Sequence, residues 1–245
     1  MALDPRIASR VTRYRREASK LLAKASERVA VPPPAWQLRN RVGGRWEEIG
    51  RQQFDFLLSE GLSPEHVFID LGCGVLRGGL HFINHLDVGN YYGIDISPDM
   101  IAGGFAEAAS AGLSEKRPTL RATDTFDIDF GRKFDYGIAL SVFTHVPWNS
   151  CFRALANVSA NFAPGGRFYA TFFPGPDGPE RFEPILQQVV PPATDRVTTF
   201  GDRNHYHYSP ADFERLAALV GLELTVIGDW GHLRGQHMLR FTKPA

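Results

Sequence analysis

From about Arg45 onward, two patterns of apolar residues alternate along the chain. Stretches with one apolar face at helical spacing predict helices, and short continuous apolar runs that enter Gly- or Asp-containing turns predict buried strands. In order, they predict helices at 46–58, 80–85, 97 onward and 148–162, and strands at 67–71, 90–95, 119–123, 134–140 and 167–173. This regular succession indicates a mostly parallel sheet that helices cover on both faces.

Capping residues and a terminal strand pair complete this pattern. Ser97-Pro98 and Ser209-Pro210 each place serine at a helix N-cap and proline in the first turn. The second of these helices should end at Val220, and strands at 222–227 and 237–242 should pair as a hairpin. The predicted fold class is α/β: a doubly wound, mostly parallel seven-stranded sheet with a C-terminal antiparallel hairpin, plus an N-terminal helical arm.

Residues 1–30 combine an apolar stripe at helical spacing with a strong positive charge. Eight Arg or Lys residues stand there against three Asp or Glu residues, which is 8 − 3 = +5. The stripe predicts an amphipathic helix. Three roles are open for it: a homodimerisation arm, an anchor on an anionic surface, or a helix that packs on the domain with a solvated basic face. Pro32-Pro33-Pro34 stiffens the chain after it, so we place an arm and linker at 1–44 and the main domain at 45–245.

Within the main domain, residues 174–209 are rich in Pro and Gly and show no periodicity. The segment is too long for a plain connection in a compact domain, which predicts a lid or a substrate wall.

Composition narrows the class of protein. An apolar fraction of 43% and a charged fraction of 22% are typical of a globular protein, and the formal net charge of zero makes nucleic acid an unfavoured partner. The basic arm nevertheless keeps RNA open. Two cysteines cannot build a disulfide framework, which favours a cytoplasmic location. No run approaches the ~18 apolar residues that span a bilayer, so no transmembrane segment is expected.

The first predicted strand ends in the turn Asp70-Leu71-Gly72-Cys73-Gly74. Its two glycines let the backbone turn sharply and approach a ligand closely. A dinucleotide turn would carry a third glycine, but Leu76 stands near that place and Gly78 comes one position late. The acidic Asp70 suits the ammonium of an aminoacyl group better than a pyrophosphate.

Acidic residues also follow the next two strands. Asp95, followed by Ile96, ends the second strand, where a carboxylate can accept both hydroxyls of a ribose. After the third strand, Asp124-Thr125-Phe126 is placed to meet an adenine amino group and ring face. Because the carboxyl ends of parallel strands line one edge of the sheet, these groups should share one site.

Over residues 45–242 this series resembles the class I, Rossmann-like S-adenosylmethionine (SAM)-dependent methyltransferases. The resemblance implies that Asp70, Gly72, Cys73 and Gly74 hold the methionine part of SAM, and that S-adenosylhomocysteine is the product. It further implies cofactor-binding roles for Asp95, Ile96, Asp124, Thr125, Phe126 and Ser141. The segment Ala163-Pro164-Gly165-Gly166 is another recurrent element of the family. Where many members carry a third glycine this chain has Leu76-Arg77, and we expect Arg77 to cap the next helix.

The segment after the fourth strand bears on the methyl acceptor. Enzymes that methylate exocyclic amines often carry an Asn/Asp-Pro-Pro-aromatic segment there, whereas this chain carries Ser141-Val142-Phe143-Thr144-His145. Methyl transfer is an in-line displacement in which a hydroxyl acceptor must lose its proton. His145 is therefore a candidate general base, or else it caps the helix that begins near Pro147.

Two further histidines, His207 and His232, can converge on His145 if the hairpin loop lies at the same sheet edge. The three are candidate catalytic residues and candidate ligands of Mg²⁺ or another divalent metal, with Asp202 or Asp229. They can equally hydrogen-bond a polar substrate.

The candidate substrate-binding residues are Trp148, Tyr208, Trp230 and Gln236. Aromatic rings among them, together with Tyr206, can stack on sugar rings or belong to the core. Two segments look like those of bacterial carbohydrate and secondary-metabolite methyltransferases. They are Trp46…Gly50…Gln53 and Asp229-Trp230-Gly231-His232. The likeness extends to the sugar O-methyltransferases of methylated mannose polysaccharides.

The resulting hypothesis is a SAM-dependent O-methyltransferase that acts on a small polar acceptor, with a carbohydrate as first candidate. Methylation of a secondary metabolite or of RNA is the alternative. A non-catalytic SAM-binding protein would bind the cofactor without turnover. A nicotinamide dehydrogenase would need the third glycine and a hydride-transfer site, and the sequence shows neither.

Overall fold

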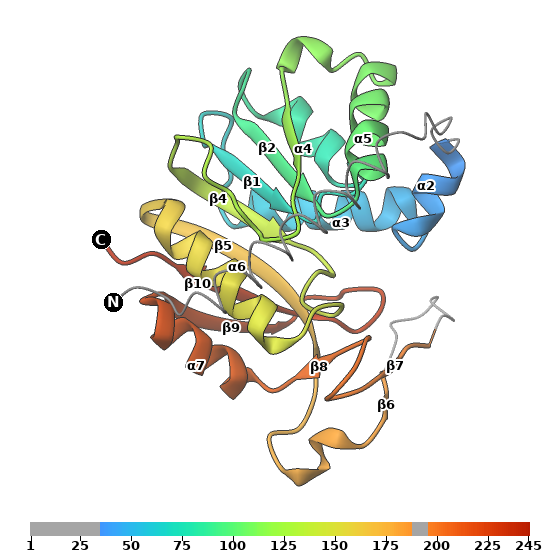
Figure 1. Cartoon of the computed structure of the whole chain (residues 1–245). Helices are drawn as coiled ribbons and strands as arrows, with labels where there is room; N and C mark the ends of the chain where they lie inside the picture. Colours follow the sequence, from blue (N-terminus) through green and yellow to red (C-terminus); the bar gives the residue numbers. More distant parts are fainter. Residues whose placement is uncertain (1–34, 188–195) are drawn as a thin grey trace, which may run out of the picture. The chain divides into compact units, whose positions relative to one another are not determined.

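The computed structural model describes residues 35–187 and 196–245 of the chain (Figure 1). The predicted basic helix, with its roles in dimerisation or anchoring, and the prolines at 32–34 lie outside these residues. Residues 34–245 form one compact unit. No helix in the described ranges is long and apolar enough to cross a membrane.

The central sheet has the strand order β3-β2-β1-β4-β5-β10-β9 (Figure 1). The first five strands of this order run parallel to one another. This confirms the doubly wound sheet, whose order reverses at β1. The strand bounds are β1 Phe68–Leu71, β2 Tyr91–Asp95, β3 Thr119–Ala122, β4 Phe134–Ala139, β5 Phe162–Pro174, β9 Glu223–Asp229 and β10 His237–Thr242.

The last strand, β10, lies between β5 and β9 and is antiparallel to both. Strand β9 therefore points the same way as the parallel strands. The loop that joins β9 to β10 consequently opens at their carboxyl edge, as the hairpin prediction required.

Helices cover the two faces of the sheet with separate cores. On one face α6 (Trp148–Asn161) and α7 (Pro210–Val220) bury residues such as Leu155 and Phe213. On the other face α3 (Trp46–Ser59), α4 (Gly79–His85) and α5 (Pro98–Ser110) bury residues such as Phe54, Phe82 and Ile101. A short 3₁₀ helix, η1 (Ser114–Lys116), precedes β3.

The predicted serine caps are confirmed. The Ser97 side chain accepts a hydrogen bond from the backbone N–H of Met100 at the start of α5. Ser209 and Asp212 form a reciprocal capping box at the start of α7. Each cap satisfies backbone donors that a helix leaves unpaired, so both helices begin where the sequence predicted.

Two elements differ from the sequence prediction. Residues expected to continue the linker form a helix, α2 (Ala35–Arg41). Strand β5 begins at Phe162 and includes residues 163–166, which we expected to lie between the helix 148–162 and the strand 167–173. Gly165 adopts φ 79° there, and the register against β4 shifts between Phe134 and Tyr136. An irregularity in the ladder thus takes up the glycines that we expected to end the helix in a loop.

The segment 174–209 contains short elements of its own. These are the 3₁₀ helix η2 (Pro179–Phe182) and the strands β6 (Ile185–Leu186), β7 (Thr198–Thr199) and β8 (His207–Tyr208). Strands β6 and β7 pair with each other, and β8 extends the central sheet beside the end of β5. The segment is therefore fastened to the carboxyl edge of the sheet, and its role as a lid or substrate wall stays a prediction.

Candidate cofactor and active site

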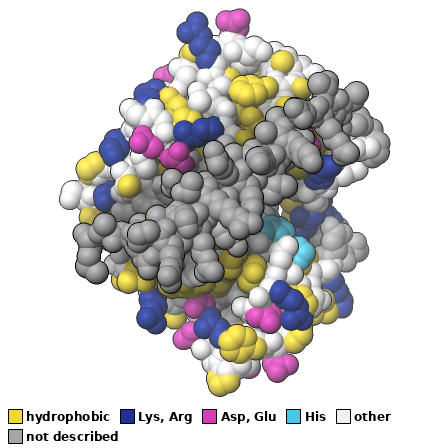
Figure 2. Space-filling view, viewed as in Figure 1, with side chains coloured by type: hydrophobic (Ala, Val, Ile, Leu, Met, Phe, Trp, Pro, Cys, Tyr) yellow, Lys and Arg dark blue, Asp and Glu magenta, His cyan; other side chains and the backbone are white. Residues whose placement is uncertain are grey.

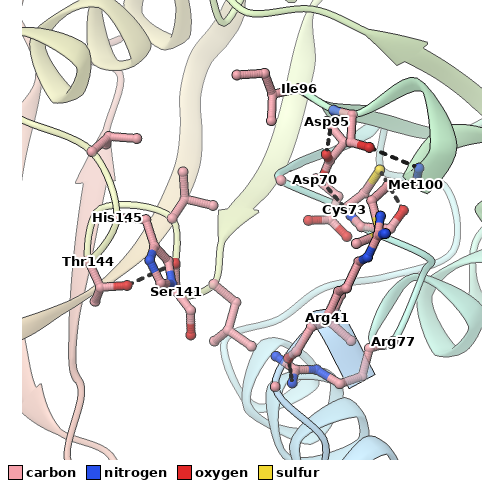
Figure 3. Close-up of a pocket in the computed structure, with 18 of the residues that line it drawn as sticks. Arg41, Asp70, Cys73, Arg77, Asp95, Ile96, Met100, Ser141, Thr144 and His145 are labelled. Carbon is pink, nitrogen blue, oxygen red and sulfur yellow. Dashed lines mark hydrogen bonds between the residues drawn. The ribbon is translucent and has the colours of Figure 1, made fainter. Parts of the chain in front are cut away.

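A cavity of about 780 Å³ opens at the carboxyl edge of the sheet. Its walls come from the segments that follow β1, β2, β3 and β4, and from the loop before β10. Figure 3 shows Asp70, Cys73 and Asp95 on one side of it and Ser141, Thr144 and His145 on the other. This is the place where open α/β sheets bind their ligands.

The glycine turn forms one wall of the cavity. Gly72 (φ 75°) and Gly74 (φ 53°) both adopt left-handed backbone conformations, which glycine reaches without steric cost. A Cβ on Gly72 would meet Val142 Cγ2 at 2.5 Å, and one on Gly74 would meet Val42 Cγ1 at 2.8 Å. The backbone amides of Gly72 and Cys73 both donate to Ile94 O, at 2.8 and 2.9 Å. The turn is thus tied to β2 and leaves room only for a residue without a side chain.

Leu76, near the place of the missing third glycine, adopts the conformation that a glycine would favour. Its φ is 69° and its side chain is fully buried. A left-handed conformation costs a residue with a Cβ roughly 1–2 kcal/mol, whereas burial of a leucine side chain stabilises by roughly 1.5–3 kcal/mol. Leu76 therefore allows the same backbone conformation as a glycine would at this position, and its side chain adds a contact to the core.

The expectation that Arg77 caps the next helix is wrong. Gly78 is the N-cap of α4 and receives no side-chain hydrogen bond. Instead, Arg77 Nη1 donates to Val42 O at 2.6 Å and to Gly44 O at 3.2 Å. Arg77 thereby fastens the loop between α2 and α3 against the glycine turn, and it lines the cavity.

Asp70 is 5% exposed and accepts a hydrogen bond from the hydroxyl of Tyr91 at 2.9 Å. Burial raises the pKa of Asp70 to about 7, against the opposing effect of the Tyr91 hydrogen bond. A carboxyl group this costly to ionise is poised to gain from a cationic ligand group in the cavity.

The raised pKa of Asp70 predicts a pH-dependent stability. Between pH values of about 4 and 7 the folded protein holds a proton that the unfolded chain releases, so the free energy of unfolding falls as the pH rises. Asp70→Asn keeps an acceptor for Tyr91 but cannot titrate. Denaturant unfolding at pH 5 and pH 8 should show a decrease on the order of 2–3 kcal/mol in the wild type that the variant lacks. Equal pH dependence in both proteins would contradict the assignment.

Asp95 ends β2 beside the turn. Its Oδ2 accepts from Gly74 N at 3.0 Å and its Oδ1 from Ser97 N at 2.9 Å. Burial raises the pKa of Asp95, although these backbone donors oppose the shift. Next to it, the apolar side chain of Ile96 is 73% exposed at the cavity wall. The site thus offers a carboxylate and an adjacent apolar surface.

The other predicted cofactor residues divide into two groups. Cys73, Asp124, Phe126 and Ser141 line the cavity, whereas Thr125 does not. Thr125 pairs instead with Thr123, with 3.1 Å between the hydroxyl oxygens. Phe126 (φ 56°) and Ser141 (φ 60°) both adopt left-handed conformations. Such strain in residues with side chains gathers at functional sites.

Gln236 is held in the cavity wall by a small hydrogen-bond network. Its Oε1 accepts from Ser141 Oγ at 3.0 Å and from Thr171 Oγ1 at 2.7 Å, and Thr171 Oγ1 itself accepts from Ser141 N at 2.7 Å. With the oxygen of Gln236 occupied, its NH₂ is the group that it can offer to a ligand.

His145 lies in the wall opposite the glycine turn and is exposed (Figure 3). Its Nδ1 is 2.9 Å from Asn204 Oδ1, and its ring centroid is 4.8 Å from that of His205. Desolvation lowers the pKa of His145, Asn204 opposes the shift, and the nearby His205 and Arg234 lower it further. Histidine side chains also reach the surface at a hollow on the face shown in Figure 2.

The structure does not bring the other two candidate histidines to the cavity. His207 is buried, with Nδ1 at 3.0 Å from Thr199 Oγ1 and Nε2 at 2.6 Å from Arg181 O, so both ring nitrogens are engaged. His232 is fully buried beside Trp230, and burial lowers its pKa to about 3. The described residues contain no cluster of three His, Cys, Asp or Glu side chains that could hold a metal ion.

Three of the four candidate substrate-binding residues also lie outside the cavity wall. Tyr208 is buried and donates to Val146 O at 2.7 Å. Trp148 packs against the core of the α6 face, and Trp230 packs on Phe56 with ring centroids 5.2 Å apart. Gln236 alone of the four lines the cavity.

Sequence reasoning missed the contribution of the α2–α3 region to the cavity. Arg41, Val42, Gly43 and Gln53 line it, as does Arg234 from the β9–β10 loop. Arg234 also donates to Gly43 O. The sequence signal that could have indicated this loop is the pair Gly43-Gly44. Both glycines adopt positive φ, which is typical of a tight turn.

The carboxylates that line the cavity gather on one side of it. Among the described lining residues, the three carboxylates are Asp70, Asp95 and Asp124, which follow β1, β2 and β3. Arg41 and Arg77 line the same side of the cavity (Figure 3). The segment after β4, which carries His145, contributes no carboxylate among the described lining residues. Arg234 donates to Gly43 O, and its charge acts on both Arg77 and His145.

Comparison with known proteins agrees with this geometry. Residues 69–168 match a family model described as a methyltransferase domain. A magnesium protoporphyrin IX methyltransferase (ChlM) from Synechocystis, solved with bound S-adenosylhomocysteine, is 17% identical with a TM-score of 0.60, over 86% of this chain and 95% of that one. The sugar N-methyltransferase KedS8 from Streptoalloteichus is 16% identical with a TM-score of 0.61, over 86% and 93%. CalS10, an amino pentose methyltransferase from Micromonospora echinaspora, is 18% identical with a TM-score of 0.56, over 87% and 97%.

Residues 69–168 thus belong to a methyltransferase domain, and the chain has the Rossmann-like fold of the class I methyltransferases. Both findings support a SAM-dependent methyltransferase.

Proposed function

We propose that the protein transfers the methyl group of SAM to a hydroxyl of a small polar acceptor, with a carbohydrate as first candidate. The observation that carries this proposal is the position of His145 in the wall opposite Asp70 and Asp95 (Figure 3). A protonated amine beside His145 would meet the His205 ring and the positive charge of Arg234, and the segment that carries His145 contributes no carboxylate among the described lining residues. A hydroxyl needs only a base for its proton, which His145 can supply.

The carboxylate-bearing wall fits SAM. In this proposal Asp70, Gly72, Cys73 and Gly74 hold the methionine part, and Asp95 and Ile96 hold the ribose. A Cβ at Gly72 or Gly74 would collide with Val142 or Val42, so these positions admit only glycine. Both glycines line the cavity, where a ligand can approach their backbone. The remaining proposed contacts are Asp124, Phe126 and Ser141 in the wall, with Thr125 supporting the turn beside them.

The residues of the chain then have two tasks. Bound SAM supplies a methyl group that its sulfonium already activates, so the protein mainly aligns the acceptor oxygen in line with it. His145 takes the proton of that oxygen, and the Gln236 NH₂ is placed to hold another oxygen of the acceptor. A metal-assisted route would need ligands other than His207 and His232, whose positions are described above.

Two observations bear on the carbohydrate. The sugar methyltransferases among the similar structures suggest an acceptor of sugar size. The proposed stacking residues Trp148, Tyr208 and Trp230 lie outside the cavity wall, so recognition would depend on polar groups such as Gln236 and His205. A secondary metabolite with a sugar-like hydroxyl array fits the same wall.

The test is turnover of SAM against a panel of neutral sugars, amino sugars, phenols and RNA, each with Mg²⁺ and with a chelator. We expect O-methylated product from a neutral sugar or phenol, and none from the amine of an amino sugar. An N-methylated product would contradict the proposal. Binding of SAM without turnover on any acceptor would favour a non-catalytic SAM-binding protein.

A further inference from the structure

We propose that Asn204 is a positioning residue for His145: its amide oxygen holds the imidazole in the tautomer whose Nε2 lone pair faces the cavity. This inference rests on the proposed role of His145 as the base. The contact joins residues 59 positions apart, with Asn204 Oδ1 at 2.9 Å from His145 Nδ1. An amide oxygen can only accept, so Nδ1 must carry the proton and Nε2 is left free to take one.

The loop that carries Asn204 is fastened on both sides of it. Phe200 N donates to His205 O at 2.8 Å, and His207 N donates to Phe200 O at 3.0 Å. Tyr206 N donates to Thr144 O at 2.7 Å, directly beside His145 in sequence. These bonds fix the backbone of the loop against the segment that carries the base, which is what a positioning residue requires.

Buried His207 is the anchor of this loop. Its two ring nitrogens contact Oγ1 of the buried Thr199 and the backbone oxygen of Arg181, both in the 174–209 segment. The histidine that we expected in catalysis thus has a different task in this inference: it holds the loop from which Asn204 reaches His145.

An amide suits this place better than a carboxylate would. Within the part of the chain that the structure describes, the charged or titratable groups that act on His145 are His205, from the loop that carries Asn204, and Arg234, from the β9–β10 loop. Desolvation and both of these groups lower the pKa of His145, which favours the neutral imidazole that can accept a proton. After proton uptake at Nε2, Nδ1–H still donates to Asn204. A carboxylate would stabilise the imidazolium and shift the base toward its inactive form.

The test compares Asn204→Ala and Asn204→Asp, with Asn157→Ala as a matched control. Asn157 lies on α6 and its side chain donates to Arg153 O within that helix. The readouts are the His145 imidazole pKa, measured by NMR in the protein without cofactor, the kcat–pH profile, and the Kd for SAM. Asn204→Ala should lower the His145 pKa and reduce kcat about 10- to 100-fold, with an unchanged Kd for SAM. Asn204→Asp should raise the pKa by about one unit or more and move the acidic limb of the profile to higher pH.

An unchanged His145 pKa in both Asn204 variants would overturn the inference, whatever happens to turnover. A fall in kcat with no change of pKa, or with an equal fall in Asn157→Ala, would show a merely structural effect and would also overturn it. The NMR measurement requires no acceptor. Failure of His145 as the base is therefore detected separately, by full activity of a His145 variant.

Discussion

Turnover should fall about 10²- to 10⁴-fold when His145 is replaced with alanine, while the Kd for SAM stays within about twofold of the wild type. The imidazole is exposed in the wall opposite the glycine turn, which it forms with Ser141 and Gln236 (the acceptor wall). Its loss removes a proton acceptor and leaves intact the wall formed by Asp70, Asp95 and the glycine turn (the cofactor wall). Because proton uptake by His145 sets the acidic limb of the kcat–pH profile, the residual activity should lack that limb. Steady-state kinetics over pH 5–9 and calorimetric titration with SAM measure both effects.

His66→Ala is the control for this experiment. His66 precedes β1 at the opposite end of the strand from the cavity, where its Nδ1 accepts from Ser63 N at 3.0 Å. We expect its kcat to match the wild type. Partial rescue of the His145 variant by added imidazole would support a base, whereas a fully active His145→Ala protein would reject the assignment.

Replacement of Asp95 with alanine should weaken SAM binding by about 2–4 kcal/mol, or roughly 30- to 1000-fold in Kd. Two losses combine in this variant. The ribose hydroxyls lose their proposed acceptor, and the backbone amides of Gly74 and Ser97 lose the carboxylate that now orders them. Titration calorimetry gives the Kd, and thermal unfolding without SAM shows how much of the loss comes from the turn itself.

Asp95→Asn separates the two losses. The asparagine keeps one acceptor oxygen but has no charge, so its apo stability should fall less than that of the alanine variant, while SAM still binds more weakly than to the wild type. At saturating SAM both variants should retain turnover, because His145 and the acceptor wall are unchanged. An unaltered Kd in Asp95→Ala would place the ribose elsewhere.

Local signals in the sequence predicted much of this fold. The Ser97 cap, the Ser209 capping box and the glycines of the turn each depend on backbone geometry within a few residues, so the residue types alone indicated them. Likewise, the placement of Asp95 and Asp124 at one edge followed from strand direction alone.

Contacts between distant segments could not be predicted in this way. Arg77 follows the turn directly, yet its partners Val42 O and Gly44 O lie more than 30 positions earlier. Nothing in its immediate sequence distinguishes such a tether from a helix cap. Burial of His207 and His232 has the same origin, because the packing of their loops against distant segments decides whether each ring faces the cavity or the interior.

The position of β10 has a consequence for the order in which the protein folds during synthesis. Residues 237–242 fill the gap between β5 and β9, so both strands keep an unpaired edge until these residues have left the ribosome. Open edges invite pairing with other chains, and a nascent chain that stalls before His237 should therefore be prone to aggregate. Gln236 directly precedes β10. The acceptor wall is thus completed in the same late step, after the cofactor wall has already been synthesised.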